Sequence, residues 1–431
     1  MYRKLILDNG LRVVTERMPA LKSVTVGIWV NVGSRDEGAG EEGLSHFLEH
    51  MFFKGTKSRS ATQISREIDA LGGELNAFTS RETTTFYVKV LDQHIKPAVD
   101  LLSDIFRQSR FAPKEVEKEK QVVLEEIRMV QDDPEDLVQE LHAEQAMKRH
   151  PLGRSILGCA RTIQELRRAQ LLRYVRTHYH PQQTVVAVAG SFNLRELTPL
   201  LEKSFGTFMQ PGAPRMHRWP SDVSGGLVVR KKMLEQAHLC LGLPGVAVDH
   251  KDRYGAYALN ALLGGSVSSR LFQEVRERRG LAYSIYSYLS SFSDSGTFTI
   301  YAATRPREAA RVVELVSREL RRLRSRGVGD EELERTKNQM KGNLMLSLEN
   351  SQSRMSMLAK DELHQGRYMS LEEILAKIEQ VNVEQLLRLS HELLDLSRLS
   401  VTVLGPVSRK SLQSVVNWRP CDRARKSLLN K

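Results

Sequence analysis

The amino-acid sequence predicts an α+β fold made of two homologous α/β sandwich domains. Strand-like and helix-like patterns alternate along the chain, and their order in the first half returns in the second half. With 431 residues the chain exceeds the size of one ordinary hydrophobic core, so two domains agree with its length. Apolar residues make up 41% and charged residues 27%, which is typical of a globular protein rather than a disordered one.

In the first half, apolar residues at every second position between Val24 and Val30 indicate a strand. Glycines at 55 and at 72–73 end two helices, and Pro113 begins another, as prolines often do. We expect strands at about 11–16, 24–33, 75–77 and 84–90. We expect helices at about 43–53, 61–71, 95–107 and 113–131.

The second half repeats this order. We expect strands at about 239–243, 282–290 and 296–302, and helices at about 254–263, 306–324 and 330–350. Phe86 corresponds to Phe298, and the helix start at Pro113 corresponds to Gly329, at nearly the same distance along the chain. The pattern indicates a duplicated unit of about 210 residues. We therefore predict domains at 1–212 and 222–431, joined by a Pro-, Gly- and Ser-containing linker at 210–226.

The helix at 43–53 contains the pattern His46-Phe-Leu-Glu49-His50. Residues i and i+4 project from the same face of a helix, so both imidazoles can reach one metal ion. The carboxylate of Glu49 lies close enough to act on a water bound to that ion. This HxxEH order is one of the motifs of zinc peptidases, although two histidines can also share a helix face without binding metal.

A catalytic zinc site needs a third protein ligand, and the helix at 113–131 offers candidates. Glu119 and Glu126 are seven residues apart and share a face, whereas Glu125 points about 100° away from Glu126. A charged, solvated face is the alternative interpretation of these acids. Apolar neighbours such as Val116 and Val123 favour a half-buried setting for Glu119 and Glu126.

Three stretches, HFLEHMFFKGT, GGELNAFTSRETTTFYVKV and EKEKQVVLEEI, occur in this order, and GGSVSSRLFQEVRERRGLAYSIYSY follows in the second half. In these motifs the chain resembles the pitrilysin-type (inverzincin) zinc metallopeptidases. It is most similar to the branch with chains of about 430 residues, which includes mitochondrial processing peptidase subunits and their bacterial homologues. The resemblance covers most of the chain.

The resemblance implies a role for each matching residue. It implies one Zn²⁺ per chain, held by His46, His50 and Glu126. It makes Glu49 the general base and Glu119 a second acid that supports the site. The function implied is zinc-dependent endopeptidase activity on unfolded peptides or presequence-like segments.

Further matches imply residues that contact the substrate. Arg276 and Tyr283 match a pair that holds substrate and stabilises the oxyanion. Gly264 and Gly265 match a glycine-containing loop that touches substrate, and Asn76 and Ala77 match the edge strand on which the peptide lies. Asp136 and Glu140 match positions that accept a basic substrate residue, although a solvated acidic face explains them equally well.

The second half lacks the metal motif, because it has no His pair at 254–263 and no acid from Thr336 to Asn343. We therefore expect a zinc-free second domain that carries the Arg276–Tyr283 pair. In relatives of this size two chains close like a clamshell. Since this chain carries both the zinc motif and the Arg/Tyr pair, the resemblance implies a homodimer.

Two other classes of function compete with a peptidase. A non-catalytic structural member of the same family, like the core subunits of the respiratory cytochrome complex, would keep the fold without needing a zinc triad. The net charge of +12 alone suggests nucleic-acid binding, but no zinc-finger spacing or RNA-binding motif accompanies it. No apolar stretch reaches about 18 residues, so we expect no membrane insertion, and no leader pattern is seen, so we expect a cytoplasmic location.

Overall fold

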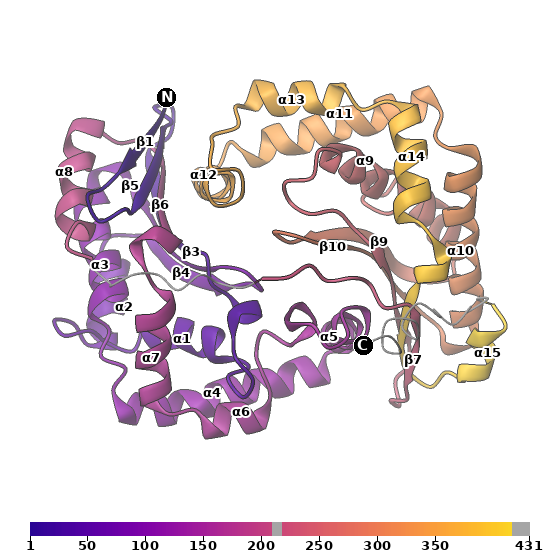
Figure 1. Cartoon of the computed structure of the whole chain (residues 1–431), viewed down its shortest axis with the longest axis horizontal. Helices are drawn as coiled ribbons and strands as arrows, with labels where there is room; N and C mark the ends of the chain where they lie inside the picture. Colours follow the sequence, from indigo (N-terminus) through magenta and orange to yellow (C-terminus); the bar gives the residue numbers. More distant parts are fainter. Residues whose placement is uncertain (209–217, 416–431) are drawn as a thin grey trace, which may run out of the picture. The chain divides into compact units, whose positions relative to one another are not determined.

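The structure is a computed structural model that describes residues 1–208 and 218–415. Its internal contacts divide the chain into two compact units, which are described separately (Figure 1). Unit 1 contains 1–129, the described part of 154–218, and 344–369. Unit 2 contains 130–153, 219–343 and the described residues from 370 onward.

Unit 1 is built on a six-stranded sheet in the order β1-β2-β6-β3-β5-β4. Strand β2 pairs with β6 in parallel, and the other neighbours are antiparallel. The strands are β1 (Tyr2–Ile6), β2 (Arg12–Arg17), β3 (Ser23–Val30), β4 (Glu74–Thr79), β5 (Thr84–Leu91) and β6 (Thr184–Gly190). Strand β4 lies at one edge of the sheet, and this edge borders the candidate site described below.

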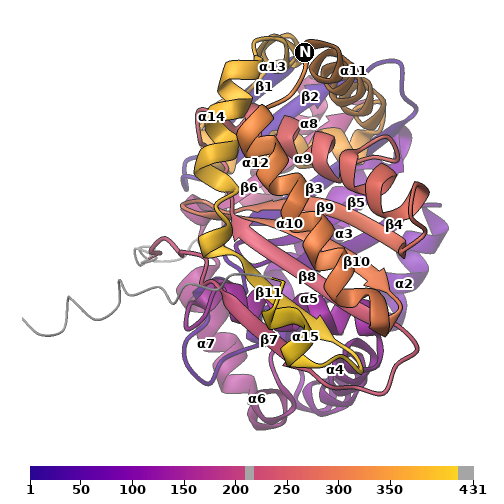
Figure 2. The same ribbon diagram turned by 90° about the vertical axis from the view of Figure 1, so that its right-hand side faces the viewer.

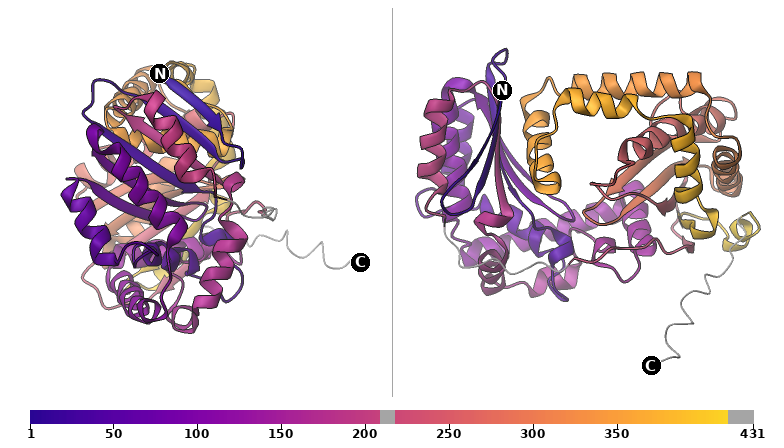
Figure 3. Two further views of the ribbon diagram at one scale, coloured as in Figure 1. Left: turned by 90° about the vertical axis from the view of Figure 1, so that its left-hand side faces the viewer. Right: turned by 45° about the horizontal axis from the view of Figure 1, so that its top comes forward.

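Helices cover both faces of this sheet. The violet and magenta helices in the left view of Figure 3 lie in front of the strands, and α12 lies on the other face (Figure 1). Residues at alternate positions of β3, such as Val26 and Ile28, enter the larger core, whereas Trp29 packs against α12. The helices are α1 (Leu44–Phe52), α2 (Ala61–Ala70), α3 (Ile95–Gln108), α4 (Pro113–Asp132), α6 (Ala160–Glu165), α7 (Arg168–His178), α8 (Leu194–Phe205) and α12 (Ser351–Gln365).

Unit 2 is built on a five-stranded sheet in the order β7-β11-β8-β10-β9. Strand β7 pairs with β11 in parallel, and the other neighbours are antiparallel. The strands are β7 (Gly226–Arg230), β8 (Ala237–Pro244), β9 (Ala282–Ser291), β10 (Gly296–Thr304) and β11 (Ser400–Leu404). Strand by strand, the order and the directions match β2-β6-β3-β5-β4 of unit 1, which confirms the predicted pair of homologous α/β domains.

The helices of unit 2 also lie on both faces of their sheet. Figure 2 shows α9, α10 and α14 in front of the strands, and α5 packs on the other face against β8 and β11. The elements are α5 (Pro134–Ala146), α9 (Arg253–Leu263), a π-helical turn (Phe272–Glu277), α10 (Ala309–Arg326), α11 (Asp330–Ser347), α13 (Leu371–Glu379), α14 (Val383–Leu393) and α15 (Arg409–Gln413). Within residues 1–208 and 218–415, no helix has the length and apolarity needed to span a bilayer.

The two units exchange segments relative to the predicted division at 1–212 and 222–431. Segment 130–153, with α5, belongs to unit 2, and segment 344–369, with α12, belongs to unit 1. The exchange has a packing reason, because each helix covers an apolar sheet face that its own half leaves open. The first part of the predicted linker, 210–217, lies outside the described residues.

Candidate metal centre

Helix α1 carries His46, Glu49 and His50. The helix begins after Gly43, whose φ of 93° is in the left-handed region that glycine tolerates. The buried carboxyl of Glu37 accepts the N–H of Gly43 at 2.9 Å and of Ser45 at 2.7 Å, which satisfies donors at the helix start. Burial raises the pKa of Glu37 to about 8, although these hydrogen bonds oppose the shift.

The histidines lie on the same side of α1, away from its apolar face. Leu44, Phe47, Leu48 and Met51 are buried in the core of unit 1, which fixes the rotation of the helix about its axis. The imidazole rings of His46 and His50 are then 4.6 Å apart, centroid to centroid. The i, i+4 spacing therefore brings both rings to one point.

Helix α4 brings Glu126 to the same point. The carboxylate Oε2 of Glu126 lies 3.7 Å from His46 Nε2 and 3.6 Å from His50 Nε2. One donor atom from each of the three side chains lies within 4.8 Å of the others. Ligands about 2.1 Å from one tetrahedral ion would be roughly 3.4 Å apart, so the observed separations suit a shared metal.

The protonation state of His46 and the hydrogen bonding of Glu126 fit a metal site. Burial opposes the charged form of His50, but its hydrogen bond to Glu119 and the nearby carboxylates raise its pKa. Burial lowers the pKa of His46 to about 4, with a smaller contribution from His50, so its imidazole is neutral at pH 7. In the described part of the chain, the buried Oε2 of Glu126 has no hydrogen-bond partner. A buried carboxylate oxygen facing two imidazole nitrogens without a donor is the arrangement that a cation would satisfy.

Glu119 contacts the ring nitrogen of His50 that does not face Glu126. Its side chain is almost fully buried, and its Oε1 lies 2.8 Å from His50 Nδ1 while its Oε2 lies 2.7 Å from the ammonium of Lys54. Burial opposes the ionised form, but His50 and Lys54 outweigh it and lower the pKa of Glu119. We infer that His50 donates its Nδ1–H to Glu119, which leaves Nε2 as the atom that faces Glu126.

Glu49 lies between the metal donors and the edge strand. The hydroxyl of Thr79, the last residue of β4, donates to Glu49 Oε2 at 2.6 Å. Burial raises the pKa of Glu49, and the hydrogen bond from Thr79 and the charge of His50 only partly offset it. Burial therefore makes this carboxyl group a stronger proton acceptor than an exposed glutamate.

Asn76 and Ala77 lie on β4, at the edge of the sheet. Asn76 is exposed, and its side-chain Oδ1 accepts the N–H of Ala77 at 2.8 Å. An exposed edge strand presents main-chain donors and acceptors that an added peptide strand can use. The two residues thus lie on the same edge strand as Thr79.

Arg276 and Tyr283 form a pair in unit 2. The guanidinium carbon of Arg276 lies 5.2 Å from the centre of the Tyr283 ring and 4.6 Å from that of Phe272. Tyr283 is 78% exposed at the start of the edge strand β9. The pair therefore places a positive charge next to an exposed tyrosine side chain.

Gly264 and Gly265 follow the end of α9. A Cβ on Gly264 would lie 2.6 Å from Ser287 Oγ, and a Cβ on Gly265 would lie 2.8 Å from Ala261 Cα. Close packing against β9 and α9 therefore requires both glycines, whatever their part in substrate binding. Asp136 and Glu140 lie one turn apart on α5, and burial together with Asp133 and Glu135 raises the pKa of Asp136.

Sequence reasoning missed Lys54 and Thr79. Lys54 lies inside the HFLEHMFFKGT motif but just after the end of α1, so its contact with Glu119 depends on how this turn packs against α4. Thr79 lies inside the NAFTSR stretch, but its contact with Glu49 depends on how β4 packs against α1.

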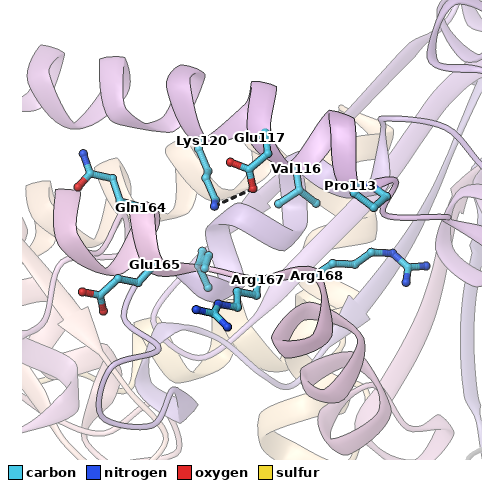
Figure 4. Close-up of a pocket in the computed structure, with 9 residues that line it drawn as sticks. Pro113, Val116, Glu117, Lys120, Gln164, Glu165, Arg167 and Arg168 are labelled. Carbon is cyan, nitrogen blue, oxygen red and sulfur yellow. Dashed lines mark hydrogen bonds and ion pairs between the residues drawn. The ribbon is translucent and has the colours of Figure 1, made fainter.

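A cavity of about 490 Å³ opens on a different face of α4 and contains none of the predicted site residues. Its lining includes Lys120, which pairs with Glu117 at 2.9 Å, and the start of α7 at Arg167 and Arg168 (Figure 4). In Figure 4 the guanidinium of Arg168 points away from the other two cations. These charges do not converge on one ligand, so the metal centre remains the better candidate.

Comparison with protein families matches both halves of the chain. Residues 12–160 match the model described as "Insulinase (Peptidase family M16)", and residues 165–340 match "Peptidase M16 inactive domain". "Uncharacterized zinc protease YmxG" of Bacillus subtilis is 44% identical, over 91% of this chain and 96% of that protein. The chain belongs to peptidase family M16. Another M16 relative, an "uncharacterized zinc protease" of Mycobacterium tuberculosis, is 43% identical over 95% of this chain and 94% of its own length.

Solved structures share the M16 fold. A protease from Helicobacter pylori has a TM-score of 0.89 at 24% identity and covers 94% of this chain and 99% of its own. A chain of "Complex III2 from Candida albicans" has a TM-score of 0.82 at 24% identity and covers 94% of this chain and 95% of its own. At these identities the likeness establishes the fold alone.

Proposed function

We propose that this protein is a zinc-dependent endopeptidase that hydrolyses peptide bonds in unfolded peptides or presequence-like segments. The observation that carries the proposal is the convergence of donor atoms from His46, His50 and Glu126 within 4.8 Å. Glu49 lies on the same turn of α1 as these histidines. We propose zinc as the metal, because the relatives are named zinc proteases and because two imidazoles with one carboxylate suit it.

His46, His50 and Glu126 would hold the zinc ion, which would supply polarisation of a carbonyl group and a lowered pKa of a water molecule. The protein supplies the proton transfer. Glu49 takes a proton from the attacking water and delivers it to the amine of the leaving peptide. Glu119 keeps His50 in the tautomer that exposes Nε2, and Lys54 keeps Glu119 ionised.

Other residues would bind the substrate. Main-chain groups at Asn76 and Ala77 would hold an extended peptide with little sequence preference. The Arg276–Tyr283 pair would stabilise the negative charge that develops on the scissile carbonyl oxygen. Gly264 and Gly265 would contact the peptide, and Asp136 with Glu140 would favour a basic side chain in it.

We further propose that the active species is a homodimer, in which the Arg276–Tyr283 pair of one chain serves the metal centre of the other. The support is that one chain carries both sets of residues, whereas the equivalent of α4 in unit 2 has no acid from Thr336 to Asn343. The cytoplasmic location stays a prediction.

The test compares the unchanged protein with Glu49→Gln. Both proteins should bind about one zinc per chain, because Glu49 is not a ligand. Cleavage of a quenched peptide library should fall at least about 100-fold in the variant, since the general base is lost. Including Arg- and Lys-containing peptides in the library tests the role of Asp136 and Glu140, which predicts a preference for them.

The second candidate is a non-catalytic structural member of the family. It is kept because residues 165–340 match a model described as an inactive domain and because a chain of Complex III2 shares the fold. Zinc binding without cleavage by either protein would favour this candidate. The absence of zinc from the unchanged protein would contradict the metal centre itself.

A further inference from the structure

The hydrogen bond between Thr79 and Glu49 connects strand β4, which would bind the peptide, to helix α1, which carries the proposed general base. Thr79 ends β4, the edge strand, and its hydroxyl donates to Glu49 Oε2 at 2.6 Å. A distance of about 2.6 Å is typical of a hydroxyl bound to an ionised carboxylate, which is among the stronger hydrogen bonds in proteins. Along β4 the side chains alternate between exposed and half-buried, and Thr79 is on the half-buried side.

A single hydrogen bond can hold the carboxyl group throughout proton transfer. A glutamate side chain has several rotatable bonds, so without a contact its carboxyl group samples many positions. The hydroxyl of Thr79 donates to Oε2, and this oxygen remains an acceptor when a proton resides on Oε1. The contact therefore survives both protonation states of Glu49.

The same residue also has a defined place relative to a bound peptide. Thr79 is two residues after Ala77, so its side chain leaves the strand on the same side, about 7 Å further along. A peptide that pairs with β4 through main-chain hydrogen bonds takes its register from this backbone. Thr79 thus connects the register of the peptide to the position of Glu49.

We propose that Thr79 is a positioning residue, which holds Glu49 by Oε2 and directs Oε1 toward the scissile bond of a peptide paired with β4. This inference rests on the proposed endopeptidase function. It predicts that loss of the Thr79 hydroxyl slows the chemical step without weakening peptide or zinc binding.

The test replaces Thr79 by valine and by serine. Valine keeps the β-branched shape but lacks the hydroxyl, whereas serine keeps the hydroxyl. Thr85→Val is the matched control, because in the described part of the chain the buried hydroxyl of Thr85 has no hydrogen-bond partner. We expect Thr79→Val to lower kcat about tenfold or more with KM within about twofold, and Thr79→Ser and Thr85→Val to stay near the unchanged protein.

Two binding measurements separate positioning from a structural role. Zinc affinity of Thr79→Val should equal that of the unchanged protein. The Glu49→Gln background prevents cleavage, so that peptide Kd can be measured. The Kd should be the same with and without the Thr79→Val change, because the hydroxyl acts on the base and not on the peptide.

The results distinguish a positioning role of Thr79 from no role, from a structural role and from failure of the proposed function. If the unchanged protein cleaves peptides and Thr79→Val cleaves them equally fast, Thr79 does not position Glu49, and the proposed function stands. A loss of kcat shared by Thr79→Ser, or a loss of zinc or peptide affinity in Thr79→Val, would assign Thr79 a structural role instead. If the unchanged protein binds zinc but cleaves nothing, the proposed function fails first.

Discussion

Glu119 is buried with one oxygen on His50 and the other on Lys54, so it has the contacts of a residue that tunes a ligand rather than of a ligand itself. Replacing it with glutamine removes the charge that favours the Nδ1–H tautomer of His50. We expect Glu119→Gln to weaken zinc binding about 10- to 100-fold, measured by competition with a chromophoric chelator.

Glu125→Gln is the control for this change. Glu125 is on the same helix, exposed, and paired with Arg128 rather than with the histidines. It should leave zinc affinity unchanged. Equal affinities for Glu119→Gln and the unchanged protein would contradict the role of Glu119 as the orienting acid.

At the residue scale, spacing rules reach the side chains that one helix places together. His46, Glu49 and His50 follow from the i, i+4 geometry of α1, and the shared face of Glu119 and Glu126 follows from their separation of seven residues. Spacing could not decide which of these two glutamates faces the histidines, because that depends on how α4 packs against α1. The hydrogen bond from Thr79 to Glu49 has the same origin in tertiary packing.

At the element scale, the docking of α5 on the sheet of unit 2 should depend on pH. His142 is fully enclosed between α5 and the strands, its Nδ1 lies 3.1 Å from Thr402 Oγ1, and burial lowers its pKa from 6.5 to about 4. A lowered folded-state pKa contributes stability above the unfolded value, and this contribution disappears as pH falls from about 6.5 to about 4. Between neutral pH and pH about 4, the loss of stability is about 3 kcal/mol.

The measurement is the midpoint of urea unfolding at pH 7 and at pH 4.5. His142→Asn keeps a polar side chain that does not titrate in this range, so its midpoint should fall less between the two pH values than that of the unchanged protein. Hydrogen exchange should locate the loss of protection in α5 and in β8 and β11. If the urea midpoints of both proteins fell equally between the two pH values, His142 would not be the group that causes the pH dependence.

Most predicted elements agree with the structure to within a few residues, because Gly72, Pro113 and similar signals mark their ends. The prediction omitted β6, although its sequence TVVAVAG is an unbroken apolar run. It also omitted α12, and a reason lies in Gly27 of β3. A Cβ there would lie 2.4 Å from Met355 Sδ, so this glycine permits the close approach of a helix more than 300 residues away in sequence, which local patterns do not reveal.

At the scale of the whole molecule, the proposed homodimer predicts complementation between two inactive variants. Glu49→Gln lacks the base, and Tyr283→Phe lacks the phenol hydroxyl. If each centre combines Glu49 of one chain with Tyr283 of the other, a mixed dimer has one intact centre out of two. Random reassociation of equal amounts should then restore about a quarter of the unchanged activity.

The experiment mixes the purified variants under conditions that allow subunit exchange and measures peptide cleavage and particle mass. Each variant mixed with itself is the control. Activity that does not rise above the sum of the separate variants, in a sample of dimeric mass, would contradict the sharing of residues between chains.

Helix α12 has a consequence for how the protein is made. The sheet of unit 1 has its apolar side around Trp29 and Tyr87 covered by Met355, Leu358 and Ala359, which come late in the chain. A ribosome must therefore synthesise the chain as far as α12 before the unit that carries His46 can cover this second face of its sheet. An unfinished chain would therefore leave this apolar face of the sheet exposed, and the proposed peptidase would be complete only late in its synthesis.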